Sequence, residues 1–272
     1  MLMDNRPIGV FDSGLGGLTA VAELQKILPS ENIIYFGDTS RVPYGGRSRE
    51  ILLKYARQDV AFLRSIDIKA ILVACGTVST TALPTLREES DLPIMGVVEP
   101  ACRRAAEITG NRRIGMIATG ASVSSGTYER VLRELDADIA VFSRACPLFV
   151  PLVENGRFRR GDSVIETVAR EYLEPLQAEN IDTLILGCTH YPLLTEVIAD
   201  IMGDGVTLIN AGAEAAREMK CTLTVGGLLA SEERQGETVL YASDLSGDFR
   251  ELAGQFLCED IPQVLRVDID RY

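Results

Sequence analysis

Two cysteines occupy matching places in the sequence, and each could act as an acid or a base. Cys188 follows the uncharged run Thr183-Leu-Ile-Leu-Gly and is followed by Thr189 and His190, the only histidine of the chain. Cys75 follows a second apolar run, Ala70-Ile-Leu-Val-Ala. Such runs are typical of buried strands, and open α/β sheets place their ligand sites at the carboxyl ends of strands. A helix that begins after each cysteine would stabilise a thiolate, so we expect Cys75 and Cys188 to meet in one cleft.

These residues also have simpler explanations. Cysteine is often just a buried apolar residue, which is our expectation for Cys102, Cys146, Cys221 and Cys258. His190 could be structural, or it could hydrogen-bond a thiolate or a substrate and titrate near neutral pH. A zinc site is disfavoured because the chain has one histidine and no C-x-x-C pair.

A glycine-rich turn, Asp12-Ser13-Gly14 with Gly16 and Gly17, follows the first predicted strand. It could cap the next helix, or present backbone N–H groups to a carboxylate or phosphate. It lacks the G-x-G-x-x-G spacing, which disfavours a dinucleotide. Thr119 and Ser122 occupy a similar turn later in the chain, with the same two interpretations. Two longer turns hold further polar candidates, Pro43-Tyr44-Gly45 and Glu154.

Composition indicates a globular protein with an ample core, since 46% of the 272 residues are hydrophobic and 24% are charged. The net charge of -12 argues against a nucleic-acid partner. No stretch approaches the roughly 20 apolar residues that span a bilayer, so we expect no membrane partner. Six cysteines without an export signal indicate free thiols in a reducing cytoplasm.

The predicted elements alternate between strands and helices, and the pattern starts again near Arg113. In the first half we expect strands at 8–11, 32–36, 70–74 and 93–98 and helices at 17–28, 48–65 and 78–88, with Glu99-Pro100 breaking the pattern. In the second half we expect strands at 114–117, 139–142 and 183–186, helices at 124–135 and 163–177, and a Pro-containing turn at 146–156. The tail should contain helices at 213–221 and 247–257 and strands at 237–242 and 264–267.

This alternation predicts an α/β fold of two pseudo-symmetric, doubly wound parallel-sheet domains, with the active site between them. The residues alone do not indicate which half the tail joins.

Five motifs, taken together, resemble the glutamate racemase family within the aspartate/glutamate racemase superfamily. They are Asp12-Ser-Gly-x-Gly-Gly, Gly37-Asp with Pro43-Tyr-Gly, Cys75-x-Thr, Ala145-Cys-Pro-Leu-Phe-Val-Pro-Leu-Val-Glu, and Gly187-Cys-Thr-His-Tyr-Pro. They occur in the family's order from about residue 7 to residue 212. The last two are highly specific together.

The resemblance implies an isomerase that interconverts L- and D-glutamate by two-base proton transfer at Cα, without a cofactor or metal. Cys75 and Cys188 would be the acid/base pair, Asp12 would assist Cys75, and His190 with Glu154 would assist Cys188. The implied substrate-binding residues are Asp12, Ser13, Pro43, Tyr44, Gly45, Gly76, Thr77, Thr119, Ser122, Cys188, Thr189 and His190.

The resemblance also implies a domain division and a cellular role. Residues 1–98 with 211–272 would form the N-terminal domain that carries Cys75, and residues 99–210 the domain that carries Cys188. The product, D-glutamate, would supply peptidoglycan synthesis and so cell-wall biogenesis and cell shape. The partner would be the small molecule glutamate, and the resemblance allows a homodimer.

Gly76 departs from the family pattern, which usually has Asn between Cys and Thr. The loss of that amide raises an alternative substrate: an aspartate racemase or a related enzyme for another acidic compound. A non-enzymatic alternative is a binding module whose two domains close on an amino acid.

Overall fold

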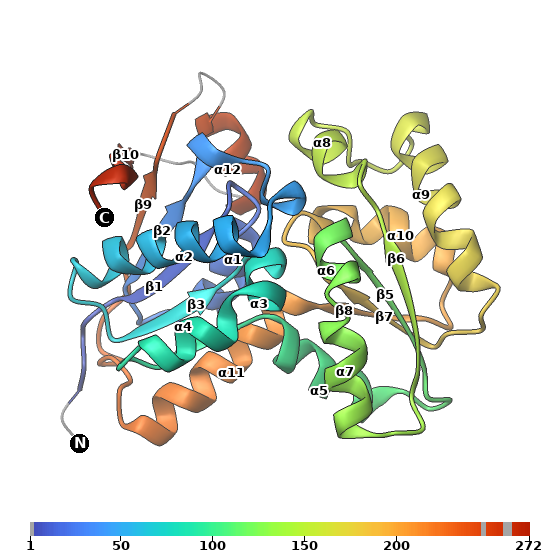
Figure 1. The fold of residues 1–272 in the computed structure, drawn as a ribbon, viewed down its shortest axis with the longest axis horizontal. Coiled ribbons are helices and arrows are strands. Elements are labelled where there is room, and N and C mark those ends of the chain that lie inside the picture. Colours follow the sequence, from blue (N-terminus) through green and yellow to red (C-terminus); the bar gives the residue numbers. More distant parts are fainter. Residues whose placement is uncertain (1–2, 246–248, 258–262) are drawn as a thin grey trace.

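The structure is a computed structural model that describes residues 3–245, 249–257 and 263–272. It contains two parallel β-sheets, each flanked by helices, side by side in Figure 1. We call the larger sheet and its helices the first domain, and the smaller sheet and its helices the second domain. The predicted fold class, two doubly wound α/β domains, is confirmed.

The first sheet has six strands in the order β10-β9-β2-β1-β3-β4. Their bounds are β1 (Ile8–Asp12), β2 (Ile33–Gly37), β3 (Ala70–Val73), β4 (Ile94–Gly96), β9 (Thr238–Ala242) and β10 (Val264–Arg266). The second sheet has four strands in the order β6-β5-β7-β8. Their bounds are β5 (Arg113–Ala118), β6 (Ala140–Ala145), β7 (Thr183–Leu186) and β8 (Thr207–Asn210).

The helices alternate with the strands along most of the chain. They are α1 (Leu18–Ile27), α2 (Arg49–Arg64), α3 (Gly76–Thr81), α4 (Leu83–Glu89), α5 (Val98–Ile108), α6 (Gly120–Ser124), α7 (Thr127–Leu135), α8 (Phe149–Glu154), α9 (Ser163–Gln177), α10 (Thr195–Met202), α11 (Ala211–Gly226) and α12 (Phe249–Leu257). Short 3-10 helices occur at Thr39–Arg41, Tyr44–Gly46, Tyr191–Leu194 and Ile269–Arg271. Within the described ranges, no helix has the length and apolarity needed to cross a membrane.

Burial explains why the uncharged runs become central strands. Every residue of β1, β2, β3 and β7 is buried, as expected for parallel strands covered by helices on both faces. In the first sheet Phe11 pairs with Val73, and in the second Ile117 pairs with Leu186. This register brings the residues that follow β1 and β3 to one edge, and those that follow β5 and β7 to the facing edge.

The tail returns to the first sheet, where β9 pairs with β2 and β10 pairs with β9. The sequence pattern alone did not indicate this position. The domain boundaries after residues 98 and 210 stay a prediction.

Four expected elements differ from the structure. Glu99-Pro100 does not break the pattern but lies in the first turn of α5, where proline needs no N–H partner. The expected turn at 146–156 contains α8, with Pro151 near its start for the same reason. The helix expected at 78–88 is divided into α3 and α4, with a proline in the first turn of α4. The helix expected at 124–135 is divided by Gly126, whose φ of 63° interrupts helical geometry.

Candidate active site

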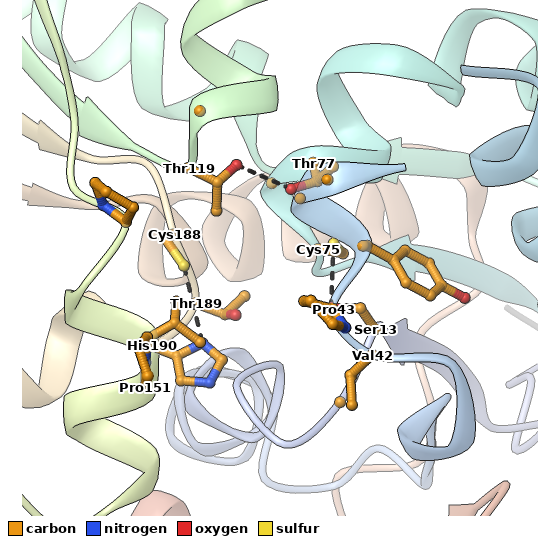
Figure 2. A pocket seen from close by; sticks show the side chains of 18 of the residues that line it. Ser13, Val42, Pro43, Cys75, Thr77, Thr119, Pro151, Cys188, Thr189 and His190 are labelled. Carbon is orange, nitrogen blue, oxygen red and sulfur yellow. Dashed lines mark hydrogen bonds between the residues drawn. The ribbon is translucent and has the colours of Figure 1, made fainter. Parts of the chain in front are cut away.

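A cavity of about 440 Å³ lies between the two domains, which is within the size range of small-molecule sites. Figure 2 shows Cys75 and Cys188 on opposite sides of it. Twelve of the predicted site residues line its wall: Ser13, Pro43, Tyr44, Gly45, Cys75, Gly76, Thr77, Thr119, Glu154, Cys188, Thr189 and His190.

Cys75 lies at the N-terminus of α3 and is 5% exposed. Its thiol donates to Ser13 Oγ across 3.7 Å. Burial, followed by the negative charge of Asp12, raises the pKa of the Cys75 thiol to about 12, although the N–H of Val78 and the Ser13 hydroxyl oppose this shift. Cys75 is therefore a thiol at neutral pH, ready to give a proton.

Asp12 ends β1 and lies behind the cavity wall rather than on it. Its side chain is fully buried, and Oδ2 accepts a hydrogen bond of 3.0 Å from the N–H of Gly14. Oδ1 has no hydrogen-bond partner among the described residues. Burial raises the pKa of Asp12, while the positive charge of His190 opposes the shift. Asp12 is thus separated from the cavity by its neighbours, and its predicted part in substrate binding stays a prediction.

Cys188, His190 and Glu154 form a hydrogen-bonded chain on the opposite side. The sulfur of Cys188 is 3.8 Å from His190 Nδ1, and His190 Nε2 is 3.0 Å from Glu154 Oε1. Burial lowers the pKa of His190, but its hydrogen bonds to Cys188 and Glu154 outweigh burial and raise this pKa to about 10. His190 is therefore an imidazolium at neutral pH, and its positive charge faces the sulfur of Cys188. Phe256 of α12 packs its ring against the imidazole edge, with the ring centroids 5.4 Å apart.

Hydroxyl groups connect the domains at the cavity wall. Thr77 Oγ1 and Thr119 Oγ1 are 3.1 Å apart, and Thr119 Oγ1 is also 3.1 Å from Ser122 Oγ. Ser122 is fully buried behind Thr119 and does not line the cavity, and its predicted role in substrate binding stays a prediction.

The segment Pro43-Tyr44-Gly45 contributes to the wall, but the phenol of Tyr44 is directed elsewhere. Its hydroxyl donates to Asp38 Oδ2 at 2.5 Å, and Arg41 Nε donates to the same oxygen at 2.6 Å. Arg41 also reaches Asp59 Oδ1 at 3.3 Å. These buried hydrogen bonds hold the segment Pro43-Tyr44-Gly45 on the side away from the cavity. Pro43 and the backbone of Gly45 are therefore left to face a ligand.

Several wall residues were not predicted: Gly14, Val42, Gly46, Gly120, Cys146, Pro147, Val150, Pro151 and Gly187. Cys146, Val150 and Pro151 lie at the end of β6 and in α8, a helix whose start the two prolines could have indicated. Among the cysteines expected to be simply buried, Cys102 is, Cys146 is buried but also lines the cavity, Cys221 is exposed, and Cys258 lies outside the described residues. In the described part of the chain, no three His, Cys, Asp or Glu side chains are grouped to hold a metal ion.

Comparison with known proteins identifies the family. Residues 21–219 match the model of the Asp/Glu/Hydantoin racemase family. A glutamate racemase of Geobacter metallireducens is 41% identical over 265 residues, which cover 97% of each chain. A glutamate racemase of Chlorobaculum tepidum is 43% identical over 259 residues, 95% of this chain and 94% of the relative.

Solved structures agree with this result. The glutamate racemase of Francisella tularensis in complex with D-glutamate superposes with a TM-score of 0.91 at 38% identity, covering 99% of this chain and 100% of the other. The Thermus thermophilus glutamate racemase in complex with beta-chloro-D-alanine superposes with a TM-score of 0.88 at 42% identity, covering 98% of this chain and 99% of the other. An aspartate racemase of Picrophilus torridus, at 18% identity and a TM-score of 0.57, shares the fold alone. The chain therefore belongs to the Asp/Glu/Hydantoin racemase family and, within it, to the glutamate racemases, which are isomerases.

Proposed function

We propose that the protein interconverts L- and D-glutamate by a two-base mechanism in which Cys75 and Cys188 exchange protons with Cα. The observation that carries the proposal is the pair of thiols on opposite sides of one cavity (Figure 2). Inversion at a carbon requires a base on one face and an acid on the other, and two facing domains supply one of each.

In one direction the Cys188 thiolate, held by the imidazolium of His190, takes the proton from Cα. The Cys75 thiol then gives its proton to the opposite face of the carbanion, which leaves a Cys75 thiolate and a Cys188 thiol. The reverse reaction exchanges the two roles. The pKa of about 12 at Cys75 and the pKa of about 10 at His190 favour this starting state, with the thiol at Cys75.

Substrate binding is assigned to the polar groups of the wall. Hydroxyls of Ser13, Thr77, Thr119 and Thr189 would bind the carboxylates and the amino group. N–H groups at the start of α3 would stabilise the negative charge that develops at Cα and its carboxylate. On the motif resemblance, we propose that no cofactor takes part.

The first test is circular dichroism of L-glutamate with the purified enzyme and no added cofactor, with L-aspartate in parallel. We expect the glutamate signal to decay to zero and deuterium from D₂O to appear at Cα. Decay with aspartate alone would keep the mechanism and change the substrate, which is the alternative raised by Gly76. Binding of glutamate without deuterium exchange would instead indicate a binding module.

We further propose, on the motif resemblance and the glutamate racemase relatives, that the enzyme supplies D-glutamate to peptidoglycan synthesis in the cytoplasm. Growth of a D-glutamate auxotroph on expression of the chain would test this role, with a Cys75→Ser variant as the negative control. A homodimer stays a prediction that light scattering would check.

A further inference from the structure

The turn that carries His190 lacks one of its own hydrogen bonds. After Cys188 the chain turns in the 3-10 pattern, in which the N–H of Tyr191 donates to the Cys188 carbonyl, three residues back, at 3.1 Å. In this pattern the next carbonyl, that of Thr189, would accept from residue 192. Residue 192 is Pro192, which has no N–H to donate. The carbonyl directly before His190 is therefore open to a donor from outside the turn.

That donor comes from the other domain. Thr19 lies in the first turn of α1, is 7% exposed, and donates its hydroxyl to the Thr189 carbonyl at 2.8 Å. The Gly16 carbonyl lies 2.9 Å from the same hydroxyl, but it already accepts the N–H of Thr19 at 3.0 Å. Because a hydroxyl has one proton to donate, the Thr189 carbonyl is its better acceptor. A side chain of the first domain thus completes the turn that carries His190 in the second domain.

The backbone just before Thr19 packs directly against His190. A Cβ atom added to Gly16 would lie 2.5 Å from Nδ1 and 2.6 Å from Cε1 of His190, and it would also overlap Thr189 Oγ1. These distances leave no room for a side chain, so a glycine is needed for such a close approach. Nδ1 is the nitrogen that faces the sulfur of Cys188 (Figure 2). The segment 16–19 therefore contacts both the ring of His190 and the backbone beside it.

The charged and titratable groups that face His190 come from several elements. Cys188 lies in the same turn, Glu154 approaches from α8, and Asp12 at the end of β1 interacts with the positive charge of the ring. Phe256 of α12 covers the ring edge and carries no charge. Burial lowers the pKa of His190, but the hydrogen bonds to Cys188 and Glu154 raise it to about 10. A ring that moves away from these partners would lose part of that increase.

We propose that Thr19 is a positioning residue for proton transfer, because its hydroxyl, bound to the Thr189 carbonyl across the domain interface, holds His190 against Cys188. The inference rests on the proposed two-thiol function. A misplacement of about 1 Å, caused by a change far from the chemistry, can reduce turnover about 100-fold. Loss of this hydroxyl should therefore lower both kcat and the pKa of His190, although Thr19 does not line the substrate cavity.

The test compares Thr19→Val, which replaces the hydroxyl by a methyl group of similar size, with Thr19→Ser, which keeps the hydroxyl. Thr183→Val is the matched control. Thr183 is also buried, and its hydroxyl donates to Asp182 Oδ1 at 2.9 Å at the start of β7, the end of the strand away from Cys188. Both valine variants lose one hydroxyl hydrogen bond, so Thr183→Val shows what that loss alone does to the enzyme.

The first readout needs no substrate. His190 is the only histidine of the chain, so isotope-labelled histidine in untagged protein gives NMR signals of this one ring. We expect its pKa near 10 in the wild type. Thr19→Val should lower this pKa by about one pH unit or more. Thr19→Ser and Thr183→Val should match the wild type.

The second readout is the turnover of glutamate. Thr19→Val should lose about 10- to 100-fold in kcat, and Thr19→Ser should recover most of this loss. The alkaline limb of the pH profile should move to lower pH in Thr19→Val alone, since only this variant frees the turn that carries His190.

Wild-type kcat or an unchanged His190 pKa in Thr19→Val would overturn the proposal, as would equal effects in Thr19→Ser or Thr183→Val. If melting curves show that Thr19→Val does not fold, Thr19→Ala replaces it, because alanine removes the hydroxyl without placing a methyl group against the carbonyl, and the same results are expected. If the wild type racemises no glutamate, the proposed function fails, while the NMR comparison still judges whether Thr19 holds His190.

Discussion

Thr77 Oγ1 and Thr119 Oγ1 lie 3.1 Å apart, one from each domain, directly beside the two thiols. Each hydroxyl can donate or accept, so a carboxylate that enters between them can receive a hydrogen bond from both. This pair is thus both a contact between the domains and a candidate carboxylate site.

Replacement of Thr119 by Val should weaken substrate binding. Hydrogen bonds to a charged group contribute about 1.5–3 kcal/mol, so KM for glutamate should rise about tenfold or more. Thr167→Val, on the exposed face of α9, is the matched control and should leave KM unchanged. Steady-state kinetics in both directions measure this, and an unaltered KM in Thr119→Val would remove the residue from the binding site.

Cys75→Ser and Cys188→Ser should each abolish racemisation, a loss of about 100- to 10,000-fold, because a serine hydroxyl is too weak an acid to replace a thiol. Melting temperatures should stay close to the wild type, since the substitution is nearly isosteric. Cys221→Ser, at an exposed position, is the control. Near wild-type turnover in either active-site variant would refute the two-base assignment.

Glu154→Gln should move the alkaline limb of the pH profile of kcat/KM to lower pH. The pKa of His190 is raised to about 10 because its hydrogen bonds to Cys188 and Glu154 outweigh burial, so the imidazolium persists until pH approaches that value. Without the Glu154 charge the imidazolium loses its proton at lower pH, and with it the support for the Cys188 thiolate. An alkaline limb at the same pH in Glu154→Gln and in the wild type would show that Glu154 does not raise the pKa of His190.

The buried cluster beneath Tyr44 predicts unequal effects of two similar substitutions. Asp38 holds both Arg41 and Tyr44 at 2.5–2.6 Å, whereas Asp59 contacts the same two side chains at 3.3 Å. Burial, together with the charge of Asp38, raises the pKa of Asp59 well above its usual range, so the surroundings disfavour a charge at Asp59 and a neutral amide should replace it at lower cost. Asp38→Asn should therefore lower the free energy of unfolding by about 3–5 kcal/mol, and Asp59→Asn by less.

Urea denaturation at pH 7 measures both variants. The raised pKa of Asp59 also has a sign that can be checked. The folded state holds this proton more tightly, so the contribution of Asp59 favours folding at low pH and declines as pH rises above the unfolded pKa of about 3.9. Asp59→Asn should remove that decline. A larger destabilisation by Asp59→Asn than by Asp38→Asn would reverse the assignment.

Much of the fold could be predicted because the central strands carry a strong signal. The runs before Cys75 and Cys188 are uncharged and fully buried, and the helix at 163–177 was predicted with the bounds it has. The helices at 98–108 and 149–154 were missed because proline was taken as a breaker, although proline in the first turn is compatible with a helix.

The site was predicted less completely, for a geometric reason. The order of the motifs indicated which residues gather at the cleft, but it did not indicate which of them reach the cavity surface. Asp12 and Ser122 lie behind the cavity wall, and the Tyr44 hydroxyl is directed to Asp38. The hydrogen bond from Thr19 to the Thr189 carbonyl depends on how two domains meet, which no local pattern of either segment specifies.

The position of β9 and β10 in the first sheet has a consequence for synthesis on the ribosome. The four strands of the second sheet lie between residues 113 and 210, so all of them are made before β9, which begins at Thr238. The second domain can close its sheet as soon as it emerges, whereas the outer edge of β2 stays unpaired until the tail arrives. An unpaired strand edge is a template for wrong pairing, so the nascent chain needs protection during this interval. The half of the molecule that is translated first is the half that is completed last.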